Sequence, residues 1–135
     1  MIAPGEADCI LGFEPAEALR MLPMLRKGGT VITSLKPIFP VSALTGGPSY
    51  DLEGILSAMR QSDAKLILVD TEKALNDLGS DKVLNTLLLG IAARTGIIGF
   101  TPDQIRKAME TVLPPKLHAL NLAALEADPS AYIRS

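Results

Sequence analysis

The segment VLNTLLLGIAARTG, residues 83–96, decides how the rest of this chain must be arranged. Its length and spacing predict a helix, and its apolar residues run round nearly the whole circumference. Such a helix cannot lie on a wet surface, so other helices, a sheet or a partner subunit must cover it. At about 1.5 Å per residue it is only about 20 Å long. With Asn85, Thr86 and Arg94 it is also too polar for a membrane span.

Small and polar residues define the expected packing and start of this helix. Gly90, Ala92 and Ala93 allow another backbone to come close to it. Ser80 or Asp81 is expected to cap its first turn, because a short polar side chain can accept a hydrogen bond from the free N–H groups there.

Length and composition limit the class of protein. A chain of 135 residues is one domain long, and we expect a single domain over residues 1–135. Its 13 basic and 15 acidic residues give a net charge of -2 without any basic run, which argues against a nucleic-acid partner. The single cysteine, Cys9, excludes an internal disulfide and a cysteine-ligated cluster made by this chain alone. Residues 1–8 lack the features of a secretory signal, so we expect a cytoplasmic location.

A strand, a helix and a second strand are predicted in succession near the N-terminus. Residues 8–12, DCILG, are typical of a strand buried on both faces. Glu14 and Pro15 open a helix. Pro23 is expected to disturb its end, and residues 26–29, RKGG, are expected to stop it. Residues 30–34, TVITS, are rich in β-branched side chains and predict the second strand. This order implies a right-handed parallel crossover.

The middle of the chain adds a third strand between two helices. Residues 36–48 form a proline-rich loop, in which helix is suppressed. Asp51 is expected to cap a helix that ends near residue 61. A strand over residues 65–69 follows, and a helix over residues 71–78 is expected to run from a cap at Asp70 to a stop at Gly79.

The C-terminal part is predicted to be helical after residue 100. Residues 101–104, TPDQ, form a complete capping box. The helix behind it carries an apolar stripe of Ile105, Ala108, Met109 and Val112. Two prolines at 114 and 115 end it, a last helix covers residues 116–126, and residues 128–135 are expected to be a frayed or partner-bound tail.

The predicted elements are about three strands and six helical segments. Three parallel strands make a narrow sheet for so many helices, and the first strand has no preceding unit to flank it. We therefore expect an α/β fold, three-layered as α/β/α with a mainly parallel sheet, that is incomplete at the N-terminus. A preceding segment or another chain would supply the remaining strands.

Few residues suggest chemistry. The segment Gly12-Phe-Glu-Pro occupies the place of a dinucleotide-binding turn, but it has one glycine, and the Glu14 carboxylate would repel an anion. His118 is the only histidine and has no metal-ligating companions in the sequence, so it is expected to face solvent or a partner. Ser34 and Lys36 follow the second strand, at the edge where parallel sheets commonly carry functional residues.

An ordered set of segments resembles a known family. Residues 7–19, 25–32 and 70–90, with Pro114-Pro115-Lys116 and Leu120-Asn121-Leu122, resemble the gamma subunit or domain of 2-oxoacid:ferredoxin oxidoreductases. The loop at residues 37–42, PIFPVS, is most similar to the version called the beta subunit of indolepyruvate oxidoreductase.

The resemblance implies a non-catalytic subunit of an assembly that oxidatively decarboxylates 2-oxoacids to acyl-CoA. Thiamine diphosphate, magnesium and iron-sulfur clusters are then expected in partner subunits, with none of them in this chain, and ferredoxin is an indirect partner. Family members begin with a strand, a glycine-rich turn and a Glu-x-Arg-Gly-Gly-like segment that this sequence lacks. The chain is therefore expected to be the C-terminal portion of a gamma-type domain. No catalytic residue can be carried over, and the residues expected to face the rest of the complex are Ser34, Lys36, Pro37 and Asn85.

Two other functions fit the same residues. The chain could be a stand-alone α/β module that binds a small ligand or a nucleotide. It could also be an oligomerisation domain, in which the apolar helix and an exposed sheet edge pair two copies. A homodimer is compatible with the subunit interpretation as well.

Overall fold

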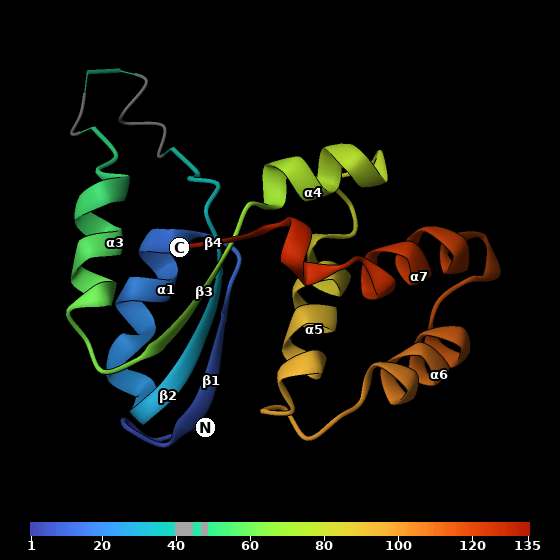
Figure 1. The fold of residues 1–135 in the computed structure, drawn as a ribbon, viewed down its shortest axis with the longest axis horizontal. Coiled ribbons are helices and arrows are strands. Elements are labelled where there is room, and N and C mark those ends of the chain that lie inside the picture. The colour runs from blue at the N-terminus through green and yellow to red at the C-terminus, as the bar shows by residue number, and fades with distance from the viewer. Residues whose placement is uncertain (40–44, 47–48) are drawn as a thin grey trace. The chain divides into compact units, whose positions relative to one another are not determined.

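The computed structural model describes residues 1–39, 45–46 and 49–135. The chain divides into two compact units, Met1–Val69 and Asp70–Ser135, which Figure 1 shows in blue to green and in yellow to red. The single domain expected over residues 1–135 stays a prediction.

The first unit is built on three parallel strands, β1 (Ala7–Gly12), β2 (Leu25–Ser34) and β3 (Lys65–Val69), with β2 in the middle. Ile10 of β1 lies opposite Val31 of β2, which in turn lies opposite Leu66 of β3. The α/β class with a parallel sheet is therefore confirmed. The three predicted strands agree with the structure in position, and β3 has the predicted bounds.

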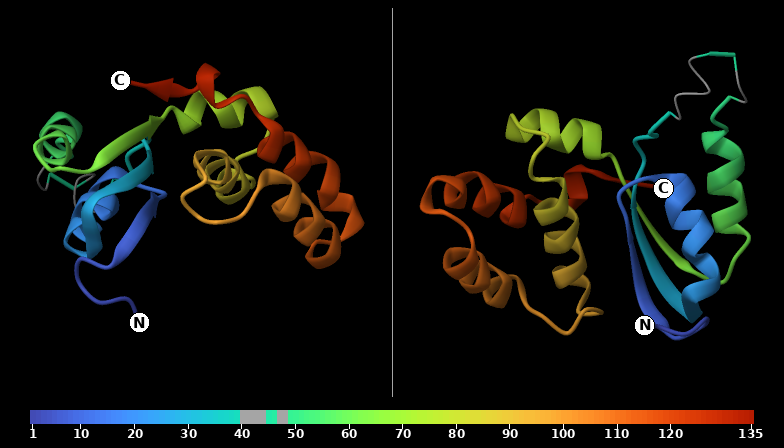
Figure 2. Two further views of the ribbon diagram at one scale, coloured as in Figure 1. Left: turned by 60° about the horizontal axis from the view of Figure 1, so that its bottom comes forward. Right: turned by 180° about the vertical axis from the view of Figure 1, so that it is seen from behind.

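Two helices, α1 (Pro15–Met21) and α3 (Leu52–Arg60), lie beside the same face of this sheet in Figures 1 and 2. Between them and the strands lies a core of Ala18, Val31, Leu56, Met59 and Leu68, each at most 4% exposed. Both helices begin at the residues where the sequence predicts their start. Their first turns are capped by the carboxylates of Glu14 and Asp51.

The helix stop expected at residues 26–29 is wrong. α1 already ends at Met21, and a 3-10 turn, η1 (Leu22–Met24), follows it. Pro23 in that turn has no N–H to continue the helical ladder, which is the physical reason for the early end. Residues 26–29 instead belong to β2.

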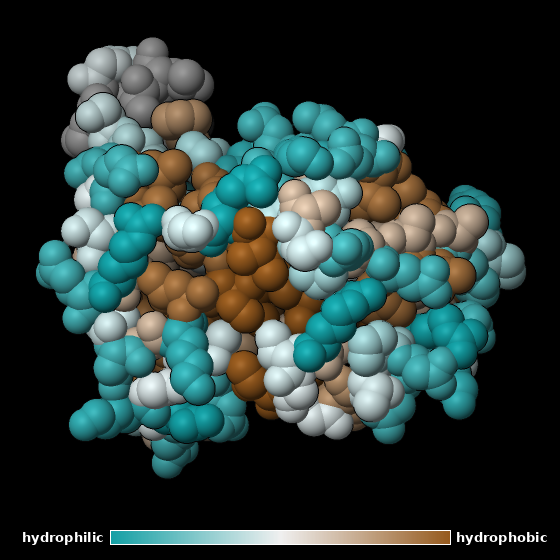
Figure 3. All heavy atoms as spheres, viewed as in Figure 1, coloured by the Kyte–Doolittle hydropathy of each residue, from teal (hydrophilic) through white to brown (hydrophobic). Residues whose placement is uncertain are grey.

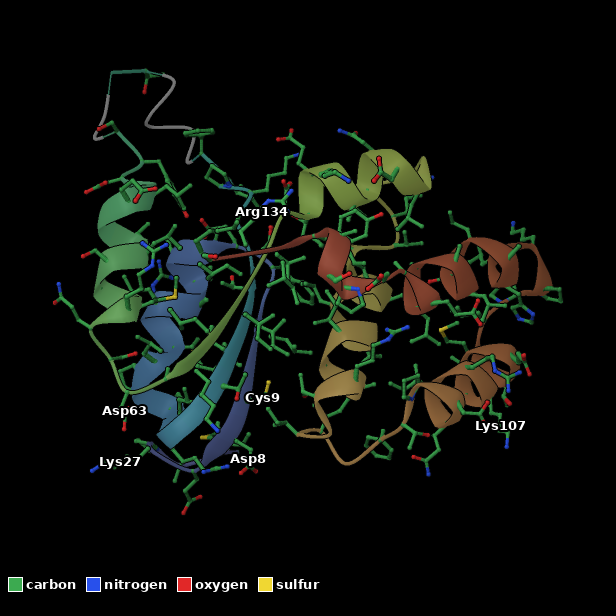
Figure 4. All side chains as sticks on the ribbon, viewed as in Figure 1. Asp8, Cys9, Lys27, Asp63, Lys107 and Arg134 are labelled. Atoms are coloured by element: carbon green, nitrogen blue, oxygen red, sulfur yellow. The ribbon has the colours of Figure 1, made fainter. Side chains whose placement is uncertain are left out.

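These residues form an irregular part of the β1–β2 ladder. Ala7 pairs with Leu25, but Cys9 pairs with Thr30, so β2 carries extra residues between these two points. The Arg26 guanidinium lies 2.6 Å from the Asp8 carboxylate, and the N–H of Gly28 donates to Asp63 in the turn before β3. Figure 4 shows Asp8, Lys27 and Asp63 at the same end of the unit. Polar contacts therefore hold the bulged segment at both sides.

The second unit consists mainly of four helices, α4 (Thr71–Leu78), α5 (Leu84–Thr95), α6 (Pro102–Val112) and α7 (His118–Glu126). A 3-10 turn, η2 (Pro115–Leu117), joins α6 to α7. The core includes Ala93, Ile105 and Leu125, against which Leu89 and Met109 pack. The capping box at Thr101 is confirmed, as is the cap at Asp70.

The apolar segment at residues 83–96 is confirmed as a packing helix. α5 contacts α7 closely at Gly90, where an added Cβ would lie 2.8 Å from the carbonyl oxygen of Leu125. Arg94 donates to the carbonyls of both Gly90 and Leu125, at 3.1 and 2.8 Å. Thr86 donates to the side chain of Asn121 at 2.6 Å, one turn nearer the start of both helices.

The cap expected for this helix at Ser80 or Asp81 is wrong. Its N-cap is Val83, which makes no side-chain hydrogen bond. A turn over residues 81–83 delays the start of the helix, so both polar side chains lie too early in the chain to reach its first N–H groups. The Ser80 hydroxyl instead accepts a hydrogen bond from the N–H of Lys82.

The C-terminal tail forms regular structure, so the expectation of a frayed tail is wrong, while a partner-bound tail stays a prediction. It forms a 3-10 turn, η3 (Pro129–Ala131), and a short strand, β4 (Ile133–Arg134). The N–H of Asp70 donates to the carbonyl of Tyr132, and Arg134 pairs with the Asp70 carboxylate at 3.0 Å. The Tyr132 hydroxyl donates to Asp77. Hydrogen bonds from Lys73 and Tyr132 lower the pKa of Asp77, because they stabilise its charged form.

The close contact at Gly90 predicts that any side chain at this position lowers the stability of the fold. We expect Gly90→Ala to lower the free energy of unfolding by about 1–3 kcal/mol, because the new methyl group meets backbone atoms of α7 that have little room to move. Urea unfolding followed by circular dichroism measures this. Asn85→Ala, at an exposed position of the same helix, is the control and should change stability by less than about 0.5 kcal/mol. A Gly90→Ala protein as stable as the wild type would contradict the packing described here.

Candidate functional site

The carboxyl end of β1 leads into the start of α1, where a nucleotide phosphate would bind in many α/β proteins. Here the Glu14 carboxylate occupies that place and is only 7% exposed. One of its oxygens accepts a hydrogen bond from the N–H of Glu17 at 2.8 Å. The other accepts from the hydroxyl of Tyr50. The chain's own carboxylate therefore caps this helix.

Tyr50 ties the segment before α3 to the start of α1. Its hydroxyl oxygen also accepts a hydrogen bond from the N–H of Ala16 at 3.1 Å. The Phe39 ring lies edge-on to the Tyr50 ring, with 5.8 Å between the ring centroids. Burial and the neighbouring Glu14 carboxylate raise the pKa of the Tyr50 phenol, so it stays protonated and remains a donor. We call Glu14, Ala16 and Tyr50 the Glu14 clamp.

The residues expected to face a complex lie in both units. Ser34 ends β2 and is buried, and its hydroxyl accepts a hydrogen bond from the N–H of Lys36 at 3.0 Å. Lys36 is exposed and Pro37 is half-buried. The structure thus brings Ser34, Lys36 and Pro37 together at the end of β2, while Asn85 lies exposed on α5 of the second unit. Their role toward a partner stays a prediction.

The remaining candidate functional side chains are Cys9, His118 and Asp70. The pKa of the Cys9 thiol is raised, and the other two side chains bond the backbone. Burial and the Asp8 charge raise the pKa of the Cys9 thiol, which makes it a poor nucleophile at neutral pH. His118 Nε2 lies 2.7 Å from the carbonyl oxygen of Leu113, so it joins the end of α6 to the first residue of α7. The Asp70 carboxylate accepts from the N–H of Lys73, as the predicted helix cap requires.

Two findings concern metals and membranes. Among residues 1–39, 45–46 and 49–135, no group of three or more His, Cys, Asp or Glu side chains is placed to share a metal ion. None of the helices in the described part of the chain combines the length and the hydropathy that a membrane span requires.

The second unit contains an open groove between α5 and α6, with a volume of about 780 Å³. We call it the α5–α6 groove. It is lined by Lys82, Asn85, Thr86, Leu89, Phe100, Gln104, Ile105, Ala108, Met109, Val112, Leu113, Leu117 and Asn121. The lining is mainly apolar, with a few polar groups, which is the composition of surfaces that bind other molecules.

A second, smaller hollow of about 320 Å³ lies where α6 faces α7, beside His118 and Leu122. Arg106 in its lining pairs with Asp103 and Glu110 on its own helix, so its charge is already matched. In Figure 3 hydrophobic side chains lie along α7, between the hydrophilic side chains of α4 and of the outer side of α6.

The groove is the feature that the sequence did not reveal. The sequence predicts that Ile105, Ala108, Met109 and Val112 form an apolar stripe, and in the structure Ile105 is only 8% exposed. Val112 at the other end is 77% exposed. Spacing along a helix predicts which residues share a face, but not how much of that face a neighbouring helix covers.

The parallel strands with their covering helices place the chain in the α/β class. Residues 1–128 match the family described as pyruvate ferredoxin/flavodoxin oxidoreductase, and the chain belongs to this family. The resemblance to the gamma-type subunits of 2-oxoacid oxidoreductases is thereby confirmed.

Relatives of known name agree with this assignment, and a solved structure has a similar fold. The indolepyruvate oxidoreductase subunit IorB of Thermococcus kodakarensis is 34% identical over 128 residues, which cover 93% of this chain and 63% of the relative. The protein of the same name from Pyrococcus horikoshii is 33% identical over 128 residues, which again cover 93% of this chain and 63% of the relative. The crystal structure of a keto/oxoacid ferredoxin oxidoreductase gamma subunit from Geobacter sulfurreducens PCA has a similar fold, with a TM-score of 0.66 at 18% identity. The match covers 95% of this chain and 65% of that chain. The chain thus spans 63% of the length of these IorB relatives.

The Glu14 clamp predicts a loss of stability when the hydroxyl group of Tyr50 is removed. We expect Tyr50→Phe to lower the free energy of unfolding by about 1–2 kcal/mol, because it leaves one oxygen of the buried Glu14 carboxylate without its donor. Tyr132→Phe is the matched control. It removes a hydroxyl that bonds an exposed carboxylate and should cost less than about 0.5 kcal/mol.

The raised pKa of Tyr50 also predicts a pH dependence. The folded protein holds this proton more tightly than the unfolded chain, so the contribution of the phenol is complete below about pH 10 and declines as the pH rises above it. Between pH 8 and 11 the urea midpoint should fall more steeply for the wild type than for Tyr50→Phe. Parallel curves for the two proteins would contradict the clamp.

Proposed function

We propose that this chain is a non-catalytic subunit, or part of one, of a thiamine-diphosphate-dependent 2-oxoacid oxidoreductase of the indolepyruvate type. The observation that carries the proposal is the family match along residues 1–128 together with relatives named as indolepyruvate oxidoreductase subunits. In this proposal the complex oxidises a 2-oxoacid to carbon dioxide and acyl-CoA and passes the two electrons to ferredoxin.

The cofactors are proposed to belong to partner subunits. Thiamine diphosphate with magnesium would form the reacting centre there, and iron-sulfur clusters would carry the electrons. The side chains of this chain support a structural role. Glu14 caps a helix, His118 joins two helices, and the lone Cys9 is held as a thiol.

The surfaces and the location form part of the same proposal. Ser34, Lys36, Pro37 and Asn85 are proposed to face the rest of the complex. Residues 1–135 are proposed to be one domain, the C-terminal portion of a gamma-type domain, and the complex is proposed to be cytoplasmic.

Reconstitution tests this proposal. The chain is co-expressed with the thiamine- and cluster-bearing subunit encoded by the same genome and purified through a tag on this chain. Reduction of methyl viologen is then followed without oxygen in the presence of indolepyruvate and CoA. We expect co-purification and a rate at least about tenfold above that of the partner alone, equivalent to about 1.4 kcal/mol in the barrier.

The controls separate the substrate from the assembly. The chain alone should give no reduction of the dye. Phenylpyruvate and pyruvate, offered at the same concentration, show which 2-oxoacid the complex prefers. Failure of the two subunits to co-purify, together with an unchanged rate when they are mixed, would overturn the proposal.

A further inference from the structure

The apolar stripe of α6 is only partly covered within the second unit. Ile105 near the start of the helix is 8% exposed, whereas Val112 at its end is 77% exposed. Both residues line the α5–α6 groove. An amphipathic helix normally buries its whole apolar stripe. The open end of this stripe is therefore a surface without a cover among the described residues of its unit.

Large apolar side chains extend this surface along the rim of the groove. Phe100 before α6 is 61% exposed, and Leu117 before α7 is 38% exposed. The lining also contains polar side chains, among them Asn85, Gln104 and Asn121. Exposed apolar surface with a polar rim is characteristic of sites that bind another molecule.

The dimensions of the groove suit a helix. Its α5 wall runs from Asn85 to Leu89, which is about one turn, and Lys82 lines the groove just before this helix begins. Its α6 wall runs from Gln104 to Val112 and is about 12 Å long at the helical rise of about 1.5 Å per residue, which is about two turns. An amphipathic helix docked between two helices uses side chains at i, i+3, i+4 and i+7, which span this length.

The charge of the groove restricts the chemistry of its occupant. Lys82 is the one charged side chain in the lining. Within the described ranges no carboxylate forms an ion pair with it, and the Asn85 amide makes no hydrogen bond. By contrast, Asp103 on α6 already pairs with Arg106 and with Lys107, and Figure 4 shows Lys107 on the side of α6 away from α7. The available groups of the groove are thus a cation and an amide, which favour a carboxylate on the occupant.

A second copy of this chain is a poor occupant. A two-fold pair would place the same surface patch of each copy against the other. Two concave grooves that face each other leave both unfilled. A single convex element of a partner subunit suits the groove better.

We propose that the α5–α6 groove receives one amphipathic helix of a partner subunit, with its apolar side chains against Ala108 and Val112 and an Asp or Glu opposite Lys82. This inference rests on the proposed function, which supplies the partner. It identifies a docking surface in the second unit. Asn85, which the sequence placed at an interface, lies in its lining.

Binding of groove variants to the partner tests the inference. The thiamine- and cluster-bearing subunit is immobilised, and the Kd of each full-length variant is measured. Val112→Glu places a charge in the apolar groove and should weaken binding about 10- to 100-fold. Thr111→Glu is the matched control, since Thr111 is the exposed neighbour on the same helix outside the groove lining. It should leave Kd within about threefold of the wild type.

A second pair of variants tests the charge. Lys82→Glu should weaken binding about tenfold at low salt, and less at high salt because exposed charges are screened. Lys82→Arg keeps the charge and should retain wild-type affinity. Circular dichroism and urea unfolding establish that each variant is folded, which is expected since Lys82 and Val112 are exposed.

The outcomes separate this inference from the proposed function. Loss of binding by Val112→Glu and Lys82→Glu, but not by Thr111→Glu, supports the docking surface. Wild-type binding by all variants overturns the docking surface and leaves the subunit function standing. Failure of the wild type to bind overturns both. Light scattering without the partner gives the last test: a homodimer that Val112→Glu dissociates would make a second copy the occupant and overturn the inference.

Discussion

Gly90 allows α5 and α7 to approach until backbone atoms touch, and the arrangement of the second unit depends on this contact. Arg94 reinforces it by donating to carbonyls on both helices, and Thr86 and Asn121 bond across the same pair one turn earlier. α5 contacts α7 at Gly90 and contacts α6 as well. The α5–α6 groove is lined by residues of both α5 and α6.

In the first unit, the Glu14 carboxylate has a structural role. Glu14 lies at the position where an α/β protein often binds a phosphate, yet its two oxygens accept from Glu17 and Tyr50. A carboxylate stabilises the positive end of a helix and repels an anionic ligand at the same place. The Glu14 clamp therefore occupies a place where α/β proteins commonly bind an anionic ligand. It fixes the segment before α3 to the start of α1.

The family and the two surfaces describe a protein whose contribution to an oxidoreductase would lie in contacts with other chains. In the first unit, Ser34, Lys36 and Pro37 cluster at the end of β2. In the second unit, the groove presents apolar side chains and the ammonium group of Lys82. Apolar surface at the centre of an interface, with charge at its edge, provides affinity and orientation respectively.

Local sequence determined most elements of this protein and several of their ends. Asp51, Asp70 and Thr101 cap helices because each side chain reaches N–H groups only three residues away. The β-branched run of β2 and the strand over residues 65–69 follow from short-range preferences too. The family resemblance likewise needed only the order of short segments.

Tertiary structure alone decided the contacts between distant residues. The bulge that takes residues 26–29 into β2, the bond between Glu14 and Tyr50, and the tail bound to Asp70 each join residues far apart in the chain. The exposure of Val112 belongs to the same group, because it depends on how α5 and α7 pack and not on the spacing within α6. A pattern along one helix defines its apolar face, but only the positions of its neighbours decide which part of that face is left open to another molecule.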